Sequence, residues 1–307
     1  MIIVIFMLLS IFESTYGTFA GAQDKTVDYE KAIQDCQETL KVYILDDFPI
    51  NYAATQNELG IAYQALAGIK DSAINCTKAI QTFRKALKVR TLNDLPIDYA
   101  MTQYNLGNVY GTLARVRDKA INCKKAIQAY REALKVYTLD DSPIHYAAIQ
   151  NELGITYGTL ARVQNEAINY GEAIQAFQEA LKVYTLEDFP MDYAWTKYFL
   201  GSSYNILAEF KDKSVNCDKA IQNFQDTLKV YTLALFPPQH AMTHFNLGNV
   251  YGTLARVRDK AINCKKAIQA YREALKVYTL DDLPMQYIIT QENLENVYHI
   301  LVEVNEK

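Results

Sequence analysis

Apolar and polar residues follow one another along most of the chain with the spacing of an amphipathic helix. Between residues 96 and 118 the apolar or small positions are Tyr99, Leu106, Gly107, Tyr110 and Leu113, with the polar Gln103 as an exception in the series, and the steps are mostly three and four residues. Residues 119–138 repeat the pattern at Cys123, Ala126, Ile127, Tyr130, Ala133, Leu134 and Tyr137. The period-two alternation of a strand is absent from both stretches. The pattern therefore predicts two helices, and the short link Arg115–Asp118 predicts that they fold back antiparallel.

Local signals place the ends of this helix pair. Pro96 suits the first turn of a helix, where a missing N–H is tolerated. Asp94, just before it, is expected to supply a carboxylate at the helix start. Each helix should contain about 18 residues and measure roughly 27 Å, at about 1.5 Å per residue.

The helix-pair pattern returns along the chain every 47 residues. The tripeptide Leu-Lys-Val marks this period and begins at Leu40, Leu87, Leu134, Leu181, Leu228 and Leu275. The 37 residues Asn105–Asp141 recur without a change at Asn246–Asp282, an offset of 141 residues or three periods. One helix pair cannot bury both of its faces, so a fixed period of this size predicts an array whose units stack on one another.

The packing positions of the unit resemble the signature of the tetratricopeptide repeat family. The motif Leu106-Gly107-x-x-Tyr110 is followed by Ala126-x-x-x-Tyr130-x-x-Ala133, and related residues recur in the units on either side. Small residues permit a close helix crossing, and aromatic rings fill the space beside it. The resemblance implies an all-α, right-handed superhelical solenoid of stacked antiparallel helix pairs. This unit is longer than the family's usual length of about 34 residues. A polar or basic residue also stands where the family usually has Trp, at Gln56, Gln103, Gln150, Lys197 and His244.

The repeat register divides the chain into four parts. Residues 1–23 are an apolar N-terminal segment with a degenerate first helix, and residues 24–47 are an unpaired second helix. Residues 48–283 hold five full helix pairs, and residues 284–307 are expected to form a capping helix. In that last helix Glu295 replaces the packing Gly, which fits the polar end that such arrays need.

The apolar run of residues 1–12 leaves two interpretations open. It is shorter than the roughly 20 residues that span a bilayer, and Ala20-Gly21-Ala22 is typical of a signal-peptide cleavage site. However, Tyr16–Ala20 falls in register with Tyr110–Ala114, as a damaged first helix would. We expect a cytoplasmic protein, with secretion as the alternative if residues 1–22 act as a signal peptide.

The sequence offers no catalytic constellation. It lacks a nucleophile motif, a phosphate-binding loop and a pair of catalytic carboxylates, so neither enzyme activity nor a cofactor is expected. Four of the five cysteines share one repeat position, at Cys76, Cys123, Cys217 and Cys264. Stacked units place neighbouring copies about 20 Å apart, whereas a disulfide needs Cα atoms within about 7 Å. Buried free thiols are therefore predicted.

Metal and nucleic-acid binding are not expected. His240 and His244 lie four residues apart, but the Glu of a His-Glu-x-x-His zinc motif is missing. The net charge is −4, and the first helices carry few basic residues for phosphate contacts. The basic residues gather instead at the helix bend and the second helix, on what we interpret as a solvated outer face: Arg115, Arg117, Lys119, Lys124 and Lys125.

The resemblance also implies a binding surface, because in such arrays the first helix of each pair lines the concave side. By register, the partner-binding residues are then Asn57, Met101, Tyr104, Asn105, Asn108, Asn151, Trp195, Tyr198, Phe199, Ser202, Met242, Phe245, Asn246 and Asn249. This lining has almost no fixed charge, which disfavours an acidic peptide tail as the ligand. The alternative is that Tyr104, Tyr198 and Phe245 simply pack between units.

The expected function is protein binding, as a scaffold or adaptor that holds a protein or peptide segment. The alternatives are a purely structural spacer in a larger assembly and an RNA-binding helical repeat. The sequence predicts neither the partner's identity nor the oligomeric state.

Overall fold

The computed structural model describes residues 19–305, and within that range the chain forms twelve helices and no strand. The helices are α2 (Phe19–Val42), α3 (Pro49–Ala67), α4 (Ser72–Ala86), α5 (Pro96–Val116), α6 (Lys119–Ala133), α7 (Pro143–Ala161), α8 (Glu166–Ala180), α9 (Pro190–Leu207), α10 (Lys213–Leu228), α11 (Pro237–Ala255), α12 (Lys260–Ala274) and α13 (Pro284–Asn305). The predicted all-α class is confirmed. The interpretations of residues 1–18 lie outside the described residues.

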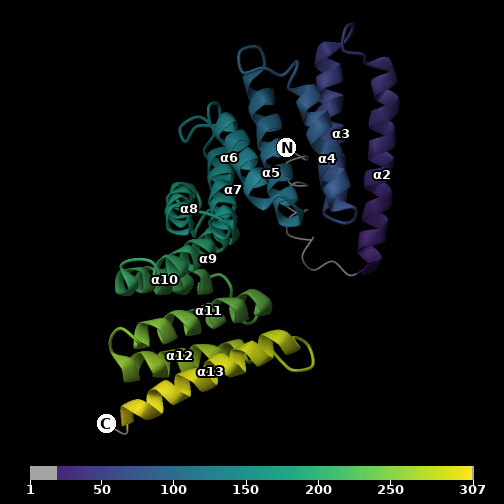
Figure 1. The fold of residues 1–307 in the computed structure, drawn as a ribbon. Coiled ribbons are helices and arrows are strands. Elements are labelled where there is room, and N and C mark those ends of the chain that lie inside the picture. Colours follow the sequence, from purple (N-terminus) through teal and green to yellow (C-terminus); the bar gives the residue numbers. More distant parts are fainter. Residues whose placement is uncertain (1–18, 306–307) are drawn as a thin grey trace. The chain divides into compact units, whose positions relative to one another are not determined.

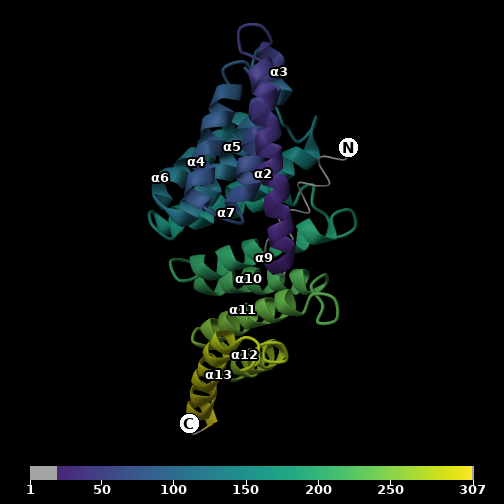
Figure 2. The ribbon, with the colours of Figure 1, turned by 90° about the vertical axis from the view of Figure 1, so that its right-hand side faces the viewer.

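The described residues divide into two compact units, residues 19–164 and residues 165–305. In the first unit each of the helices α2 to α7 packs on a neighbour in the chain, with α3/α4 and α5/α6 as its complete pairs (Figure 1). In the second unit the helices α8 to α13 pack in the same consecutive way, with α9/α10 and α11/α12 as complete pairs (Figure 2). Each unit is thus a stack of helix pairs, as the repeat predicts.

Proline begins the first helix of every pair, as expected at Pro96. The role expected for Asp94 is wrong, because the residue before α5 is Leu95 and no side chain caps the helix. Instead, the Asp94 carboxylate accepts a 2.6 Å hydrogen bond from the Thr91 hydroxyl, which in turn accepts from the Asp94 N–H at 3.1 Å. The same bonds join Thr138 to Asp141, so this pair stabilises the turn between repeats.

The second helices are shorter than the periodicity predicts. Helix α6 ends at Ala133 rather than near residue 138, and α2 ends at Val42 rather than Asp47. After Ala133 the chain makes tighter bonds, from Lys135 N to Glu132 O at 3.2 Å and from Val136 N to Ala133 O at 3.1 Å. Such bonds close the last turn of a helix, so Leu134-Lys135-Val136 lies in a turn, whereas Leu40-Lys41-Val42 forms the end of α2.

The bend inside each pair depends on a left-handed residue that the sequence analysis did not identify. Asp118 has φ 47° and ψ 44°, and Asp71, Asn165, Asp212 and Asp259 adopt the same conformation at the equivalent positions. Asp and Asn tolerate this region better than other residues with a Cβ. A buried asparagine completes the bend, since Asn122 Nδ2 donates to Arg117 O at 2.9 Å.

Glycine lies at the close crossing between the two helices of a pair, as predicted. A Cβ placed on Gly107 would lie 2.5 Å from the Tyr130 ring, and one on Gly60 would lie 2.6 Å from Phe83. Ala126 and Ala133 next to this contact are fully buried. Cys76, Cys123, Cys217 and Cys264 are buried free thiols, which confirms the prediction made for them.

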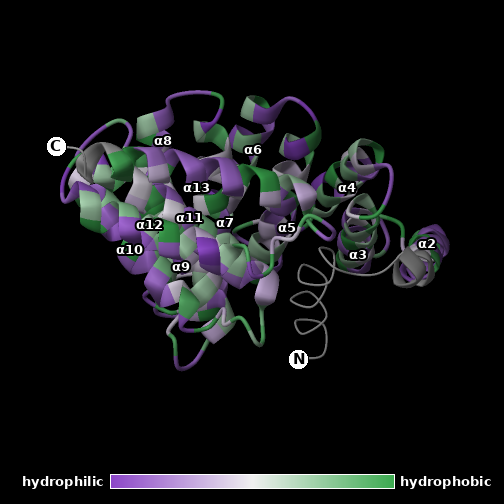
Figure 3. Ribbon diagram, turned by 90° about the horizontal axis from the view of Figure 1, so that it is seen from below, coloured by the Kyte–Doolittle hydropathy of each residue, from purple (hydrophilic) through white to green (hydrophobic). Residues whose placement is uncertain are grey.

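Figure 3 shows hydrophilic and hydrophobic residues mixed along the labelled helices. None of the helices in residues 19–305 is both long enough and apolar enough to cross a bilayer.

Candidate functional site

We define the first-helix face as the register positions of Met101, Tyr104, Asn105 and Asn108 in α3, α5, α7, α9, α11 and α13. Successive first helices touch within each unit, α3 with α5 and α5 with α7 in the first, and α9 with α11 and α11 with α13 in the second. Side chains at these positions therefore meet across repeats. Asn246 Nδ2, for example, donates to the Tyr198 hydroxyl at 2.8 Å.

In the second unit this face carries an aromatic cluster on α9. The Trp195 side chain is 38% exposed, and its ring packs edge-on against Phe199 at a centroid distance of 4.8 Å. Phe199 also contacts Tyr198 at 5.4 Å and stacks on Phe177 at 6.1 Å. Trp195 is therefore partly exposed and packs against a second aromatic ring of the same helix.

The neighbouring helix α11 contributes residues that are more involved in packing. Phe245 lies 6.1 Å from Tyr271 and 6.5 Å from Tyr278, so it belongs partly to the core of its own repeat. Asn249 Oδ1 accepts hydrogen bonds from the Tyr271 hydroxyl at 2.7 Å and from Asn293 Nδ2 at 3.1 Å. Met242, Asn246 and Ser202 are half-buried.

In the first unit, Met101, Tyr104 and Asn108 on α5 are half-buried. The Tyr104 ring lies 6.1 Å from Tyr130, whose hydroxyl donates to Asn108 Oδ1 at 2.7 Å. Burial raises the pKa of Tyr104 above its usual value, and the charge of Glu152 raises it further.

Three of the predicted partner-binding amides lie inside the stack. The exposed fractions of Asn57, Asn105 and Asn151 are 3%, 1% and 8%, so these side chains are not on a free surface. Asn57 Oδ1 accepts a 3.1 Å hydrogen bond from the Thr102 hydroxyl. Asn105 Nδ2 is buried without a hydrogen-bond partner among the described residues. The repeat register predicts on which side of its helix each asparagine lies, whereas the size of the neighbouring side chains determines how far it is exposed.

Glutamates at the Asn105 register position are the residues that the sequence analysis missed. Glu152 on α7 is half-buried and Glu58 on α3 is exposed. Burial raises the pKa of the Glu152 carboxyl, and the charge of Arg115 opposes that effect without cancelling it. Glu152 also raises the pKa of both Tyr104 and Tyr130. The expectation of a nearly uncharged lining is therefore wrong in the first unit, although Glu58 and Glu152 could have been found by extending the register.

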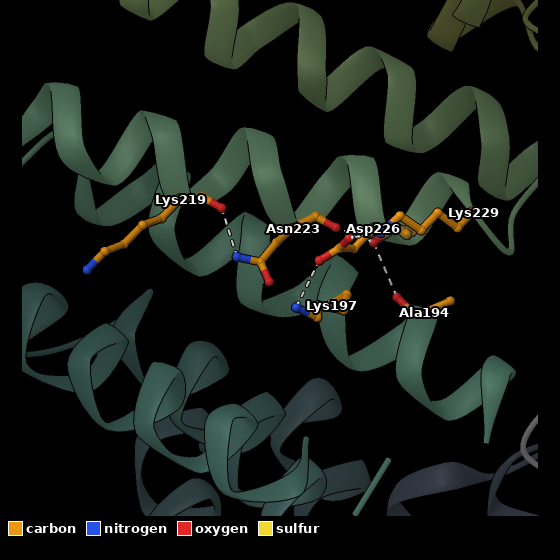
Figure 4. A network of polar contacts seen from close by, with 7 residues as sticks. Ala194, Lys197, Lys219, Asn223, Asp226 and Lys229 are labelled. Atoms are coloured by element: carbon orange, nitrogen blue, oxygen red, sulfur yellow. Dashed lines mark hydrogen bonds and ion pairs between the residues drawn. The ribbon is translucent and has the colours of Figure 1, made fainter. Parts of the chain in front are cut away.

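The basic residue at the family's Trp position belongs to a structural network in the second unit (Figure 4). Lys197 Nζ lies 3.0 Å from Asp226 Oδ2, and Lys229 Nζ lies 2.6 Å from Asp226 Oδ1. Burial alone would raise the pKa of Asp226, but the hydrogen bonds from Lys229 and Lys197 hold it below its usual value. These charges satisfy one another and tie α9 to α10.

The two histidines of α11 face each other, with ring centroids 4.4 Å apart. His240 Nδ1 lies 3.0 Å from Tyr231 O, and His244 Nδ1 is buried with no hydrogen-bond partner among residues 19–305. Burial, followed by the charge of His240, lowers the pKa of His244 to about 4, although Glu273 acts in the opposite direction. In the described part of the chain, no group of three or more His, Cys, Asp or Glu side chains is arranged to hold a metal ion.

Comparisons with known proteins extend to the fold alone. No protein-family model matches the chain, and no curated protein matches it. Among solved structures, the chain is similar to the crystal structure of BtubC (BKLC) from P. vanneervenii, with 19% sequence identity and a TM-score of 0.50. The similarity covers 83% of this chain and 90% of that one. At this identity the similarity supports a helical-repeat architecture, and the tetratricopeptide resemblance stays a prediction.

Proposed function

We propose that the protein is a non-catalytic adaptor that binds a segment of a partner protein along the first-helix face. The observation that carries this proposal is Trp195, the single Trp of the chain, which is 38% exposed on that face. Exposed Trp and Tyr rings are the residues most enriched at the energetic centres of protein interfaces. The equivalent positions in α3 and α7 hold only Ala54 and Ala148.

The packing beneath Trp195 favours binding for a second reason. The Trp195 ring packs edge-on against Phe199 at 4.8 Å, and a ring that is already packed loses less side-chain entropy on association than a free one. The half-buried Ser202 and Asn249 lie at other positions of the same face. Ser202 Oγ already donates to Tyr198 O at 2.9 Å, and Asn249 Oδ1 accepts from Tyr271 and Asn293. The Ser202 oxygen as an acceptor and the Asn249 Nδ2 group as a donor can still bond the backbone of an extended segment, which suits a peptide-like ligand.

Quantitative capture of cellular proteins on the full chain tests this function. Trp195→Ala is expected to reduce recovery of the specific partner at least about tenfold, equivalent to about 1.4 kcal/mol. The matched control is Val215→Ala on α10 of the same unit, a position that is 54% exposed and lies off the first-helix face. Equal recovery by wild type and Trp195→Ala would contradict the proposal, as would recovery that nuclease treatment abolishes.

A further inference from the structure

The two units differ in charge at one position of the first-helix face. Glu152 in the first unit and Asn293 in the second follow the two identical stretches, Asn105–Asp141 and Asn246–Asp282, at the same register. Glu152 acts electrostatically on Tyr130, whose hydroxyl donates to Asn108 at 2.7 Å, and Asn293 bonds to Asn249, which accepts from the Tyr271 hydroxyl at 2.7 Å. The chain has therefore placed a carboxylate and an amide in matched settings.

The amide is satisfied within the protein. Asn293 Nδ2 donates to Asn249 Oδ1 at 3.1 Å. An ionised carboxylate has no proton to donate, so Glu152 cannot make the equivalent bond to Asn108 Oδ1. It needs a donor or a cation instead.

The first unit only partly supplies that cation. Arg115 favours the charged form of Glu152, yet burial has the larger effect on the carboxyl group. The Arg115 side chain itself is exposed to solvent, where its attraction is weakened by water and salt. A second positive charge close to Glu152 would therefore be stabilised.

Glu58 provides a second carboxylate two repeats earlier on the same face. Glu58 interacts electrostatically with Arg90, but Arg90 is already engaged, since Nη1 donates to Thr102 at 3.1 Å and Nη2 lies 3.2 Å from Asp98. The first helices α3, α5 and α7 contact one another in series, so their equivalent positions lie about 8–10 Å apart per repeat, closer than the roughly 20 Å expected above for stacked units. Glu58 and Glu152 should therefore lie about 16–20 Å apart. An extended chain advances about 3.3 Å per residue, and it covers this distance in about five or six residues.

We propose that Glu58 and Glu152 recognise two basic side chains of an extended partner segment, spaced about five or six residues apart. The inference rests on the proposed adaptor function and names the chemistry of its partner. Tyr104 lies beside Glu152, where its ring can pack along the apolar stem of a Lys or Arg. The positions equivalent to Glu58, Asn105 and Glu152 in the second unit are Phe199, Asn246 and Asn293, so no carboxylate stands at this register there. Acidic segments are repelled from the first unit.

Selection from a random peptide display library on the full-length protein tests the proposal. Wild type should enrich peptides that carry two Lys or Arg residues five or six positions apart. Combined Glu58→Gln and Glu152→Gln should abolish that enrichment. Glu187→Gln, which removes an exposed carboxylate from the second unit, is the matched control and should keep it.

A synthetic peptide from the wild-type selection then gives a double-mutant cycle. Replacing its two basic residues with norleucine should weaken binding to wild type at least about tenfold, but binding to the double Gln variant by less than about twofold. Glu58→Gln alone should lose the preference at one basic position. Because Glu58 is exposed, this variant keeps the test valid even if Glu152→Gln fails to fold.

The possible failures can be told apart. Peptides that enrich equally on all variants, without basic residues, would overturn this inference and leave the adaptor function standing. Enrichment of acidic peptides would also overturn it. If no peptide enriches on any of the proteins, both the inference and the adaptor function are contradicted.

Discussion

Two stretches of this chain share one sequence and differ in their neighbours. Within Asn105–Asp141 and Asn246–Asp282 much of the local geometry is the same, although the first helix ends at Val116 in one copy and at Ala255, two register positions earlier, in the other. The bend residues Asp118 and Asp259 both have φ 47°, and the Tyr130–Asn108 and Tyr271–Asn249 hydrogen bonds are both 2.7 Å long.

Exposure and bonding differ between the two copies. Asn105 is 1% exposed with its Nδ2 unpaired among the described residues, whereas Asn246 is half-buried and donates to Tyr198 at 2.8 Å. The repeat sequence thus determines the internal fold of a helix pair, and the adjoining repeats determine what its surface offers to a partner.

The largest expected effect concerns the close helix crossing at Gly107 and Gly248, which the two identical stretches share. Gly107→Leu and Gly248→Leu should each destabilise the protein by about 2–3 kcal/mol, because a side chain there collides with Tyr130 or Tyr271. Denaturant unfolding should give similar losses for both. Lys125→Ala at an exposed position should cost less than about 0.5 kcal/mol. If either leucine variant were as stable as the lysine variant, the close crossing would be misassigned.

The next largest effect is a difference between the two units in how stability depends on pH. His244 occupies the register of Gln103, and its pKa of about 4 lies below the ordinary value of 6.5. As the pH falls, the His244 imidazole is therefore protonated in the unfolded chain before it is protonated in the folded protein. The stability that neutral His244 contributes is complete above pH 6.5 and is lost as the pH falls towards 4. His244→Gln should reduce the acid loss of stability by about 1–2 kcal/mol.

Melting curves from pH 7 to pH 4 measure this difference. Gln103→His in the first unit is the reciprocal variant, and it should make the protein more sensitive to acid. Superimposable pH profiles of wild type and His244→Gln would show that His244 titrates normally.

Giving the second identical stretch the neighbours of the first should give it the same preference for basic peptides. Phe245→Tyr with Asn293→Glu rebuilds the Tyr104–Glu152 arrangement beside the second identical copy. This variant should bind a basic peptide about three- to tenfold more tightly than wild type, equivalent to about 0.6–1.4 kcal/mol. Fluorescence anisotropy with the peptide and its norleucine analogue measures the gain. A gain that is the same for both peptides would not be electrostatic and would count against the role of the carboxylate.

The smallest expected effect tests whether the left-handed residue at the bend has the same energy in the two identical stretches. Asp118→Gly and Asp259→Gly relieve a left-handed residue but add freedom to the unfolded chain, so each should change stability by less than about 0.5 kcal/mol. Asp118→Ala should cost about 1 kcal/mol, since alanine adopts the left-handed conformation less readily than Asp. Thermal melts compare the three variants, and a large difference between the two Gly variants would show that the copies are strained unequally.

Local rules made most of the fold predictable. The Gly107–Tyr130 crossing, the proline at the start of each first helix and the buried cysteines all follow from residue size and backbone chemistry at one register position. The bend at Asp118 was not predicted, because a positive φ in Asp leaves no clear mark in a sequence.

The candidate site was less predictable, because its exposure depends on contacts between repeats. Asn105 and Asn246 are the same residue in the same local sequence, and only one of them bonds across to a Tyr hydroxyl. The end of α6 was placed too late because Leu134 and Tyr137 keep a helical spacing after the regular helix has ended at Ala133. Periodicity reports which side of the chain is buried, and it reports neither hydrogen bonding nor the depth of burial.

Site-specific photo-crosslinking tests the central claim, that the first-helix face binds a partner segment, most directly. A photoreactive phenylalanine derivative replaces Trp195 in one protein and Val215 in another, and each is irradiated with the partner recovered by the wild-type chain. We predict covalent attachment of the partner from position 195 and none above background from position 215. Attachment from 215 alone would place the partner on the second helices and contradict the account.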